Sequence, residues 1–219
     1  MGLPSIESYK MPGAEQLPKN RVNWTADPKR AVLLIHDMQN YFLGAFAHGQ
    51  SPVTELVQNS RKLKEQCKAL GIPVVYSAQP GDQDPEDRAL LTDFWGKGLA
   101  DDPALTGILD GLSPDEDDIV MTKWRYSAFE RTDLLDYMHR QGRDQLIICG
   151  VYAHIGCLLT ACDAFMKDIQ PFFVADAVAD FSSEFHVMAL NYVSSRCGMT
   201  TTAGRILEEL NSKAIAVSK

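Results

Sequence analysis

Two residues of opposite charge each follow a short apolar segment of the chain. Asp37 comes just after the apolar run at residues 31–35, and Lys123 follows the segment at residues 119–122. In an open parallel sheet the ligand crevice lies beyond the carboxyl ends of the strands, so both side chains would reach the same crevice. A carboxyl group and an ammonium group placed together can support acid–base chemistry. Taken singly, the aspartate could instead cap a helix and the lysine could be a surface residue.

Two further strand ends carry small or polar residues. Residues 77–80 read Ser-Ala-Gln-Pro, and residues 150–157 read Gly-Val-Tyr-Ala-His-Ile-Gly-Cys. The second segment lacks the Gly-Lys-Ser/Thr ending and the Gly-x-Gly-x-x-Gly pattern of phosphate-binding loops, so we expect no nucleotide site. No pair among His36, His154 and His186 has the spacing of metal ligands on a helix, which predicts structural histidines and no metal.

Segments typical of strands alternate with segments typical of helices. Strands are expected at residues 31–35, 72–76, 119–122, 145–149 and 172–175, and near 199–201. Helices are expected from Ser51, as N-cap before Pro52, to Gly71, from Thr132 or Asp133 to Gln141, from Leu158 to Asp168, and from a cap at Ser182 or Ser183. This alternation predicts an α/β fold of three layers (αβα), with a doubly wound, mostly parallel sheet of about six strands.

Composition narrows the possible partners and the location of the protein. The 219 residues include 21 Lys and Arg against 29 Asp and Glu, a formal charge of −8, and the basic residues are scattered. Nucleic-acid binding needs a basic stripe, so we expect none. The N-terminus lacks the charged and apolar regions of a signal peptide, and no apolar run approaches the about 20 residues of a membrane span. We therefore expect a cytoplasmic protein that does not enter the membrane.

The cysteines and the acidic runs suggest no further chemistry. Five cysteines are an odd number without the paired spacing of a zinc site or a disulfide framework, so we expect reduced thiols. Cys67 and Cys149 lie in apolar patterns and are predicted to be core residues. The acidic runs at 82–87 and 115–118 lie in turn-rich segments and are interpreted as solvated loop faces.

Long strings of residues make the chain resemble the isochorismatase family, whose relatives include cysteine-dependent hydrolases such as nicotinamidases. The strings lie at residues 30–39, 78–81, 93–96, 122–129, 150–156, 168–172 and 178–182, so they follow one another in order along most of the chain. The resemblance implies an isochorismatase-like, Rossmann-like fold. It divides the chain into an N-terminal arm at 1–30, a hydrolase domain at 31–212 and a C-terminal tail at 213–219.

The resemblance also implies a reaction without a metal or an organic cofactor. Isochorismate carries an enolpyruvyl group on a vinyl ether, and hydrolysis begins with protonation of the terminal methylene carbon. Asp37 is the expected acid. An ordinary aspartate has a pKa of about 3.9, and a neighbouring Lys123 would lower it further. We therefore expect a substrate carboxylate to engage Lys123, leaving Asp37 enclosed by Phe42, Trp95 and the ligand.

Other residues resemble the substrate-binding positions of the family. Gln79 and Arg88 are similar to its carboxylate-binding residues, and the planar guanidinium of an arginine can grip both carboxylate oxygens. Loop-stabilising hydrogen bonds are the alternative role for these two side chains. Tyr152 and the backbone at Gly156 resemble family contacts to the substrate, and the resemblance implies a cis peptide bond between Val151 and Tyr152.

One position departs from the thiol-dependent relatives. Gly156 stands where their nucleophilic cysteine is expected, and Cys157 follows one place later. One residue at the start of a helix turns a side chain by about 100°, so Cys157 is predicted to point away from the crevice. The alternative is an amidase that acts through Cys157.

The resemblance leaves the exact substrate and the partners open. Isochorismate in catecholate siderophore biosynthesis is the leading expectation, with release of pyruvate and 2,3-dihydro-2,3-dihydroxybenzoate. The same reaction on 2-amino-2-deoxyisochorismate, as in phenazine biosynthesis, is the alternative. We further expect a homodimer and consider an aryl-carrier or synthetase partner.

Overall fold

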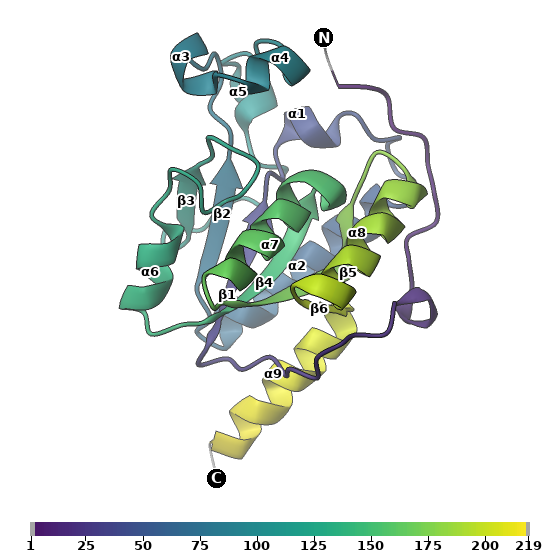
Figure 1. Cartoon of the computed structure of the whole chain (residues 1–219), viewed down its shortest axis with the longest axis vertical. Coiled ribbons are helices and arrows are strands. Elements are labelled where there is room, and N and C mark those ends of the chain that lie inside the picture. The colour runs from purple at the N-terminus through teal and green to yellow at the C-terminus, as the bar shows by residue number, and fades with distance from the viewer. Residues whose placement is uncertain (1–2, 218–219) are drawn as a thin grey trace.

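A computed structural model of the protein describes residues 3–217 and shows a single six-stranded sheet (Figure 1). The strand order is β3-β2-β1-β4-β5-β6, and every neighbouring pair is parallel. The strands are β1 (Ala31–His36), β2 (Val74–Ala78), β3 (Ile119–Thr122), β4 (Gln145–Val151), β5 (Gln170–Ala179) and β6 (Met199–Thr201). The predicted fold class is thereby confirmed.

Helices cover both faces of this sheet. The longer ones are α2 (Val53–Ala69), α6 (Leu134–Arg140), α7 (Leu158–Met166), α8 (Ser183–Arg196) and α9 (Ala203–Val217). Short helices α1 (Asn40–Leu43), α3 (Pro85–Arg88), α4 (Leu91–Trp95) and α5 (Pro103–Thr106), with a π-helical turn η2 (Ala153–Cys157), lie in the connections. Among residues 3–217, no helix is both long and apolar enough to cross a membrane.

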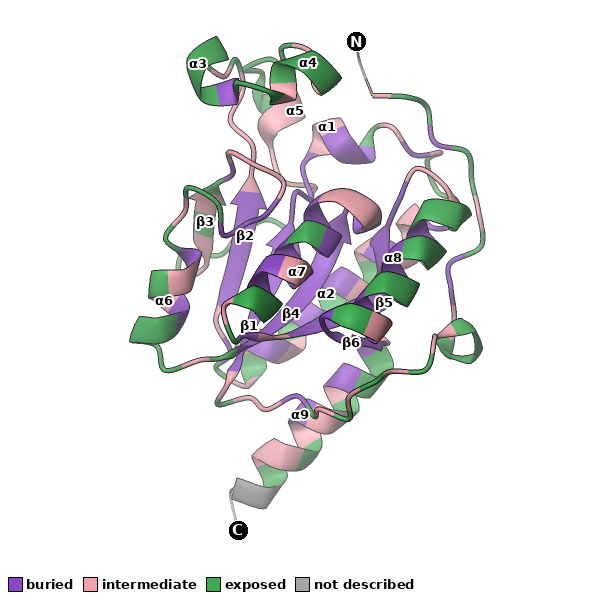
Figure 2. Cartoon of the chain, viewed as in Figure 1, coloured by how far each residue is buried: buried purple, intermediate pink, exposed green. Residues whose placement is uncertain are grey.

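The central strands are mostly apolar, and each of their faces packs against helices. All six residues of β1 are buried, and the strands stand out as buried in Figure 2. Leu33 and Ile35 of β1 belong to one core cluster, which includes residues of α2 and α9. Val32 and Leu34 belong to the other, which includes residues of α6, α7 and α8. A strand buried on both faces is what a continuous apolar run predicts in a parallel sheet.

Several element boundaries differ from the predictions. Helix α2 begins at Val53, and Ser51 is not its N-cap because its hydroxyl accepts a hydrogen bond from the backbone N–H of Met11. Strand β5 starts two residues earlier and ends four residues later than expected, since its second half pairs with the end of β4 at Gly150 and Val151. The short helices α1, α3, α4 and α5 and the long α9 were not predicted.

The N-terminal arm runs over the body with one short 3-10 turn, η1 (Ala14–Gln16). Backbone and side-chain hydrogen bonds attach the arm to the body. For example, the Ile6 N–H donates to the Ala45 carbonyl at 2.8 Å. The hydroxyl of Tyr9 accepts from the backbone N–H of Asp180 at 2.8 Å. At the other end α9 continues through Val217, so the part of the expected tail at 213–217 is helical, and residues 218–219 lie outside the described residues.

Candidate active site

The carboxyl ends of the central strands surround one pocket. The space in it that no atom occupies is about 670 Å³, part of which is open solvent. All eight residues expected at the site line it: Asp37, Phe42, Gln79, Arg88, Trp95, Lys123, Tyr152 and Gly156. The sheet explains the convergence, because β1, β2, β3 and β4 are neighbours and all end on this side.

Asp37 is held by contacts to both of its carboxylate oxygens. It directly follows β1, in the left-handed region with φ 50°. Its Oδ2 lies 2.8 Å from Lys123 Nζ, and its Oδ1 accepts a hydrogen bond from the Ser77 hydroxyl at 2.7 Å. The amide of Gln79 approaches Oδ2 at 3.5 Å. Burial alone would raise the pKa of Asp37, but the Lys123 charge, followed by His36 and the Ser77 hydroxyl, outweighs it and holds the pKa below its ordinary value.

The pocket lining carries more positive than negative charge. Arg88, Lys123 and Arg125 line it, whereas Asp37 is its one carboxylate within residues 3–217. Because Asp37 neutralises one of these three cations, two positive charges remain for a bound anion. Such a lining favours a small molecule with two carboxylates.

Arg88 makes the loop contacts considered as its alternative role and also faces the pocket. Its Nε donates to the Gly96 carbonyl at 2.6 Å, and Nη1 donates to Gln83 Oε1 at 3.3 Å. Gly98 (φ +83°) leaves room for the guanidinium, since a Cβ atom there would lie 2.6 Å from Nη1. Burial lowers the pKa of Arg88. Its contact with a substrate carboxylate remains a prediction.

Aromatic rings form part of the pocket wall. Tyr152 and Phe181 are in contact, with ring centroids 4.2 Å apart and ring planes tilted by 33°. The Tyr152 hydroxyl donates to the Phe42 carbonyl at 2.8 Å, and Trp95 Nε1 donates to the Tyr126 hydroxyl at 2.8 Å. These rings exclude water and can pack on an unsaturated ring. The peptide bond between Val151 and Tyr152 is cis, as the resemblance implied.

Sequence reasoning did not assign several lining residues to the site. Arg125 and Tyr126 follow the same strand as Lys123, so the strand-end rule pointed at their segment without distinguishing them. Leu3 of the arm and Phe181 after β5 also line the pocket. No local pattern marks these two, because they reach the pocket only through long-range packing.

Cys157 lies outside the pocket lining. Its side chain is completely buried in the core cluster against α7 and α8, and burial raises the pKa of its thiol well above the ordinary value. A thiol acts as a nucleophile through its thiolate, which this environment disfavours. The predicted direction of Cys157, away from the crevice, agrees with this placement.

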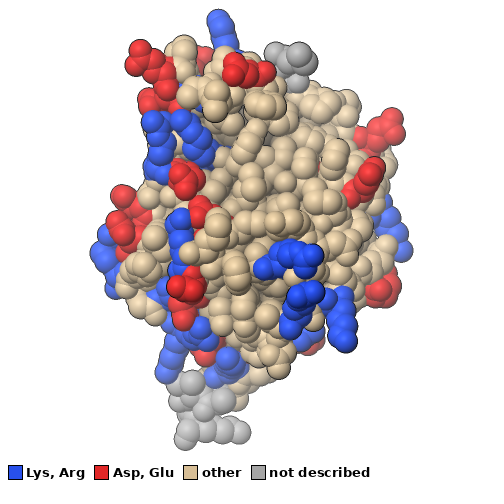
Figure 3. Space-filling model, in the orientation of Figure 1, with Lys and Arg blue, Asp and Glu red and all other residues tan. Residues whose placement is uncertain are grey.

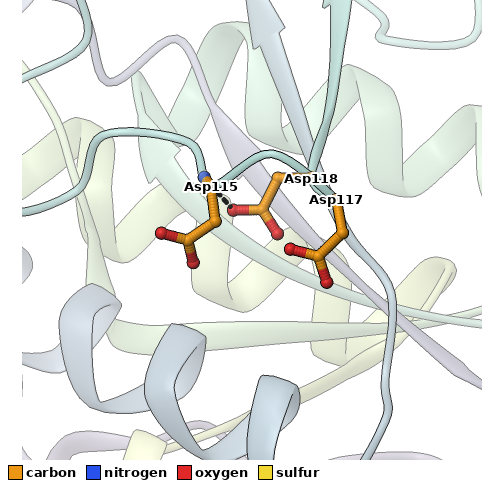
Figure 4. A group of neighbouring side chains, drawn as sticks. All are labelled: Asp115, Asp117 and Asp118. Carbon is orange, nitrogen blue, oxygen red and sulfur yellow. Dashed lines mark hydrogen bonds between the residues drawn. The ribbon is translucent and has the colours of Figure 1, made fainter.

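The histidines and the acidic cluster already have protein partners. His36 and His186 contact the carbonyls of Val151 and Ala175, and His154 contacts Asp180. Away from the pocket, three carboxylates meet in the loop before β3: Asp115, Asp117 and Asp118 (Figure 4). Lys68 of α2 lies within 2.9 Å of all three, and Lys64 lies 3.4 Å from Asp115 and Asp118, so two ammonium groups already offset most of their charge. On the face shown in Figure 3, acidic and basic side chains are interspersed around an uncharged middle.

Fold and pocket together define a three-layer αβα protein with a buried carboxyl–ammonium pair and no thiol among the lining residues within 3–217. The sequence profile of the isochorismatase domain matches residues 31–205. The chain therefore belongs to the isochorismatase family, and it is an enzyme of the hydrolase class.

Individual relatives support this placement. The chain is 61% identical over its full length to "Isochorismatase" of Bacillus subtilis, covering 70% of that protein. It is 48% identical to "Enterobactin synthase component B" of Escherichia coli, again over its full length and covering 75% of the relative. "Phenazine biosynthesis protein PhzD1" of Pseudomonas aeruginosa is 50% identical, with 94% of this chain and 99% of the relative covered.

Solved structures show the same fold. An isochorismatase family protein from Burkholderia thailandensis superimposes with a TM-score of 0.77 at 26% identity, covering 85% of this chain and 98% of the other. A cysteine hydrolase from Pseudomonas syringae gives a TM-score of 0.79 at 22% identity, covering 90% and 98%. At that identity the second comparison supports the fold alone.

Proposed function

We propose that the enzyme hydrolyses the vinyl ether of isochorismate, giving pyruvate and 2,3-dihydro-2,3-dihydroxybenzoate, in siderophore biosynthesis. The observation that carries this proposal is the lining of the pocket, which brings Asp37 together with Lys123, Arg88 and Arg125. Isochorismate has two carboxylates and one bond that must be opened by a proton. The lining offers cations for the first and an acid for the second. The identity to the Bacillus subtilis protein named Isochorismatase supports the same substrate.

The proton donor must first gain a proton. In the pocket as it stands, Lys123 keeps Asp37 ionised. A substrate carboxylate that binds Lys123 neutralises the lysine charge, and the burial of Asp37 then raises its pKa. Because Ser77 donates to Oδ1, the proton belongs on Oδ2, the oxygen that Lys123 releases.

The reaction then proceeds in balanced steps. Asp37 gives its proton to the methylene carbon of the enolpyruvyl group, and the ether oxygen stabilises the resulting oxocarbenium ion. Water adds to the cationic carbon and returns one proton to Asp37. The hemiketal collapses as its hydroxyl proton passes to the departing ring oxygen, which releases pyruvate and the diol. The acid is therefore regenerated and no covalent enzyme intermediate forms.

Hydrolysis in heavy water tests this mechanism. Protonation at carbon requires pyruvate with deuterium in its methyl group, detected by NMR, and the reaction should proceed with chelator present. Cys157→Ala should retain activity within about threefold, because the thiol packs in the core and does not line the pocket. Absence of pyruvate would contradict the assignment. Loss of activity in Cys157→Ala with an unchanged melting temperature would favour the amidase-type alternative.

The amino analogue is the second candidate substrate. The 50% identity to the phenazine biosynthesis protein supports 2-amino-2-deoxyisochorismate, which carries the same vinyl ether and the same carboxylates. Competition between the two substrates in one assay ranks them by kcat/KM. A homodimer, a cytoplasmic location and an aryl-carrier or synthetase partner remain predictions from the sequence.

A further inference from the structure

Gly156 packs directly against the imidazole ring of His36. A Cβ atom added to Gly156 would lie 2.3 Å from Cε1 and 2.9 Å from Nε2 of that ring. Ordinary carbon contacts are about 3.5–4.0 Å, so both distances are forbidden. Gly156 is not among the glycines with positive φ, and its backbone would accept alanine. The obstacle to a side chain at this position is therefore His36.

The ring of His36 is held in place by its surroundings. The residue is completely buried, and as the end of β1 it is paired with both β2 and β4. Its Nδ1 lies 3.0 Å from the carbonyl of Val151, in the segment that brings Tyr152 and Gly156 to the pocket. On the other side Gly150 packs on its backbone, where a Cβ atom would lie 2.1 Å from the His36 carbonyl oxygen. His36 is thus fixed between two glycines.

A side chain at position 156 would enter a site equipped for covalent catalysis. Gly156 lines the pocket together with Asp37 and Lys123, the kind of charged groups that activate a thiol or a hydroxyl. Within residues 3–217, no serine, threonine or cysteine lines this pocket. His36 excludes a nucleophile from 156, and the neighbouring thiol of Cys157 is buried in the core.

We propose that His36 is a positioning residue that decides the type of reaction. Its imidazole occupies the space of a side chain at position 156 and holds the following loop through the Val151 carbonyl, so the pocket keeps an acid but no covalent nucleophile. The catalytic meaning of this inference rests on the proposed function. The steric coupling between His36 and Gly156 does not.

A double-mutant cycle tests the coupling. Gly156→Ala should lower the melting temperature by several degrees and kcat by about 100-fold, because the loop must move. His36→Ala should lower the melting temperature and kcat less than Gly156→Ala does. Adding Gly156→Ala to His36→Ala should lower them little further, because the new methyl group fills the space that the ring has left. Gly204→Ala is the matched control: it lies in α9 with nothing within 4 Å of an added Cβ, so it should keep the wild-type kcat and melt no lower than the wild type, since alanine favours a helix over glycine.

A thiol at position 156 gives a second readout. In Gly156→Cys combined with His36→Ala, iodoacetamide should modify the introduced thiol much faster than Cys157, as seen by peptide mass spectrometry. In Gly156→Cys alone, the protein should melt at a lower temperature because the ring and the thiol compete for the same space.

Two results would overturn the inference. One is a Gly156→Ala variant as stable and active as Gly204→Ala, and the other is a double variant whose losses in melting temperature simply add. The proposed function fails separately, if the wild-type enzyme releases no pyruvate from isochorismate while the melting temperatures still show the coupling.

Discussion

Lys123 Nζ lies 2.8 Å from Asp37 Oδ2, and the two side chains are only 4% and 6% exposed. At this distance and burial, the ammonium group stabilises the ionised carboxylate strongly. With Lys123 in contact, Asp37 is therefore held in the ionised form, which cannot donate a proton. Under the proposed mechanism, a substrate carboxylate that engages Lys123 reverses this, so substrate charge would be a condition for catalysis as well as for binding.

Replacing the acid should stop the reaction. Asp37→Asn keeps the shape of the side chain but cannot donate the proton to carbon, and we expect kcat for pyruvate release to fall by about 100- to 10,000-fold. Asp136→Asn, an exposed aspartate on α6, is the control and should leave kcat unchanged. Substantial activity in Asp37→Asn would place the proton donor elsewhere.

The Ser77 hydroxyl should lower the pKa of Asp37 in the enzyme–substrate complex. Its hydroxyl donates to Asp37 Oδ1 and lowers the pKa of that carboxyl, so Ser77→Ala should raise it. Activity needs protonated Asp37 and is lost as pH rises through its pKa in the substrate complex. The alkaline limb of kcat against pH should therefore move to higher pH in Ser77→Ala, while kcat itself falls because Asp37 is less well oriented. Ser60 is a buried serine of α2, and Ser60→Ala should leave the alkaline limb at its wild-type pH. An alkaline limb that does not move in Ser77→Ala either would argue against the effect of Ser77 on the Asp37 pKa.

The same pair should contribute to stability with a definite pH dependence. The pKa of Asp37 is lower in the folded protein, so its contribution is complete above the ordinary value of about 3.9 and is lost as pH falls through the folded-state pKa. Asp37→Asn leaves Lys123 buried without a charged partner, which costs about 3 kcal/mol at neutral pH. Urea unfolding at pH 7 and below pH 4 should show this difference shrinking in acid. A difference independent of pH would contradict the ion pair.

The absence of a side chain at Gly98 should keep the Arg88 guanidinium in its position at the pocket. An alanine at this position would place its methyl group 2.6 Å from Nη1, which displaces the guanidinium from the pocket. We expect KM to rise at least about tenfold, with a smaller change in kcat, since one carboxylate contact is lost. Gly49→Ala is the matched control, because it has a similar positive φ (67°) and nothing within 4 Å. An equal KM in both variants would mean that Arg88 does not bind substrate.

The sequence predicted β1, β3 and β6 close to their observed bounds, but it placed the buried strand β2 at 72–76 instead of Val74–Ala78. The run at residues 31–35 is apolar throughout because β1 is covered on both faces, and β6 was expected at its observed position. The second half of β5 was missed because Asp176 interrupts the apolar pattern, while the pairing that extends the strand comes from distant β4. Helix α9 was missed although Ile206 and Leu210 face the core.

For the site, the strand-end rule and the family resemblance identified different residues. The strand-end rule located Asp37 and Lys123 from local pattern alone. Arg88 and Trp95 lie in the connection between β2 and β3, and only the family resemblance pointed to them. Leu3 could not be found, because its place in the pocket depends on how the arm attaches through Ile6 and Tyr9.

The residues that line the pocket belong to elements of very different burial. Asp37 is attached to β1, in the middle of the sheet, whereas Arg88 and Trp95 belong to short, largely exposed helices set apart at the top of Figure 2. Amide hydrogens of β1 should exchange with solvent only through near-global unfolding, and those of α3 and α4 through inexpensive local opening. Under the proposed function, local opening of α3 and α4 would release the product while Asp37 keeps its position on β1.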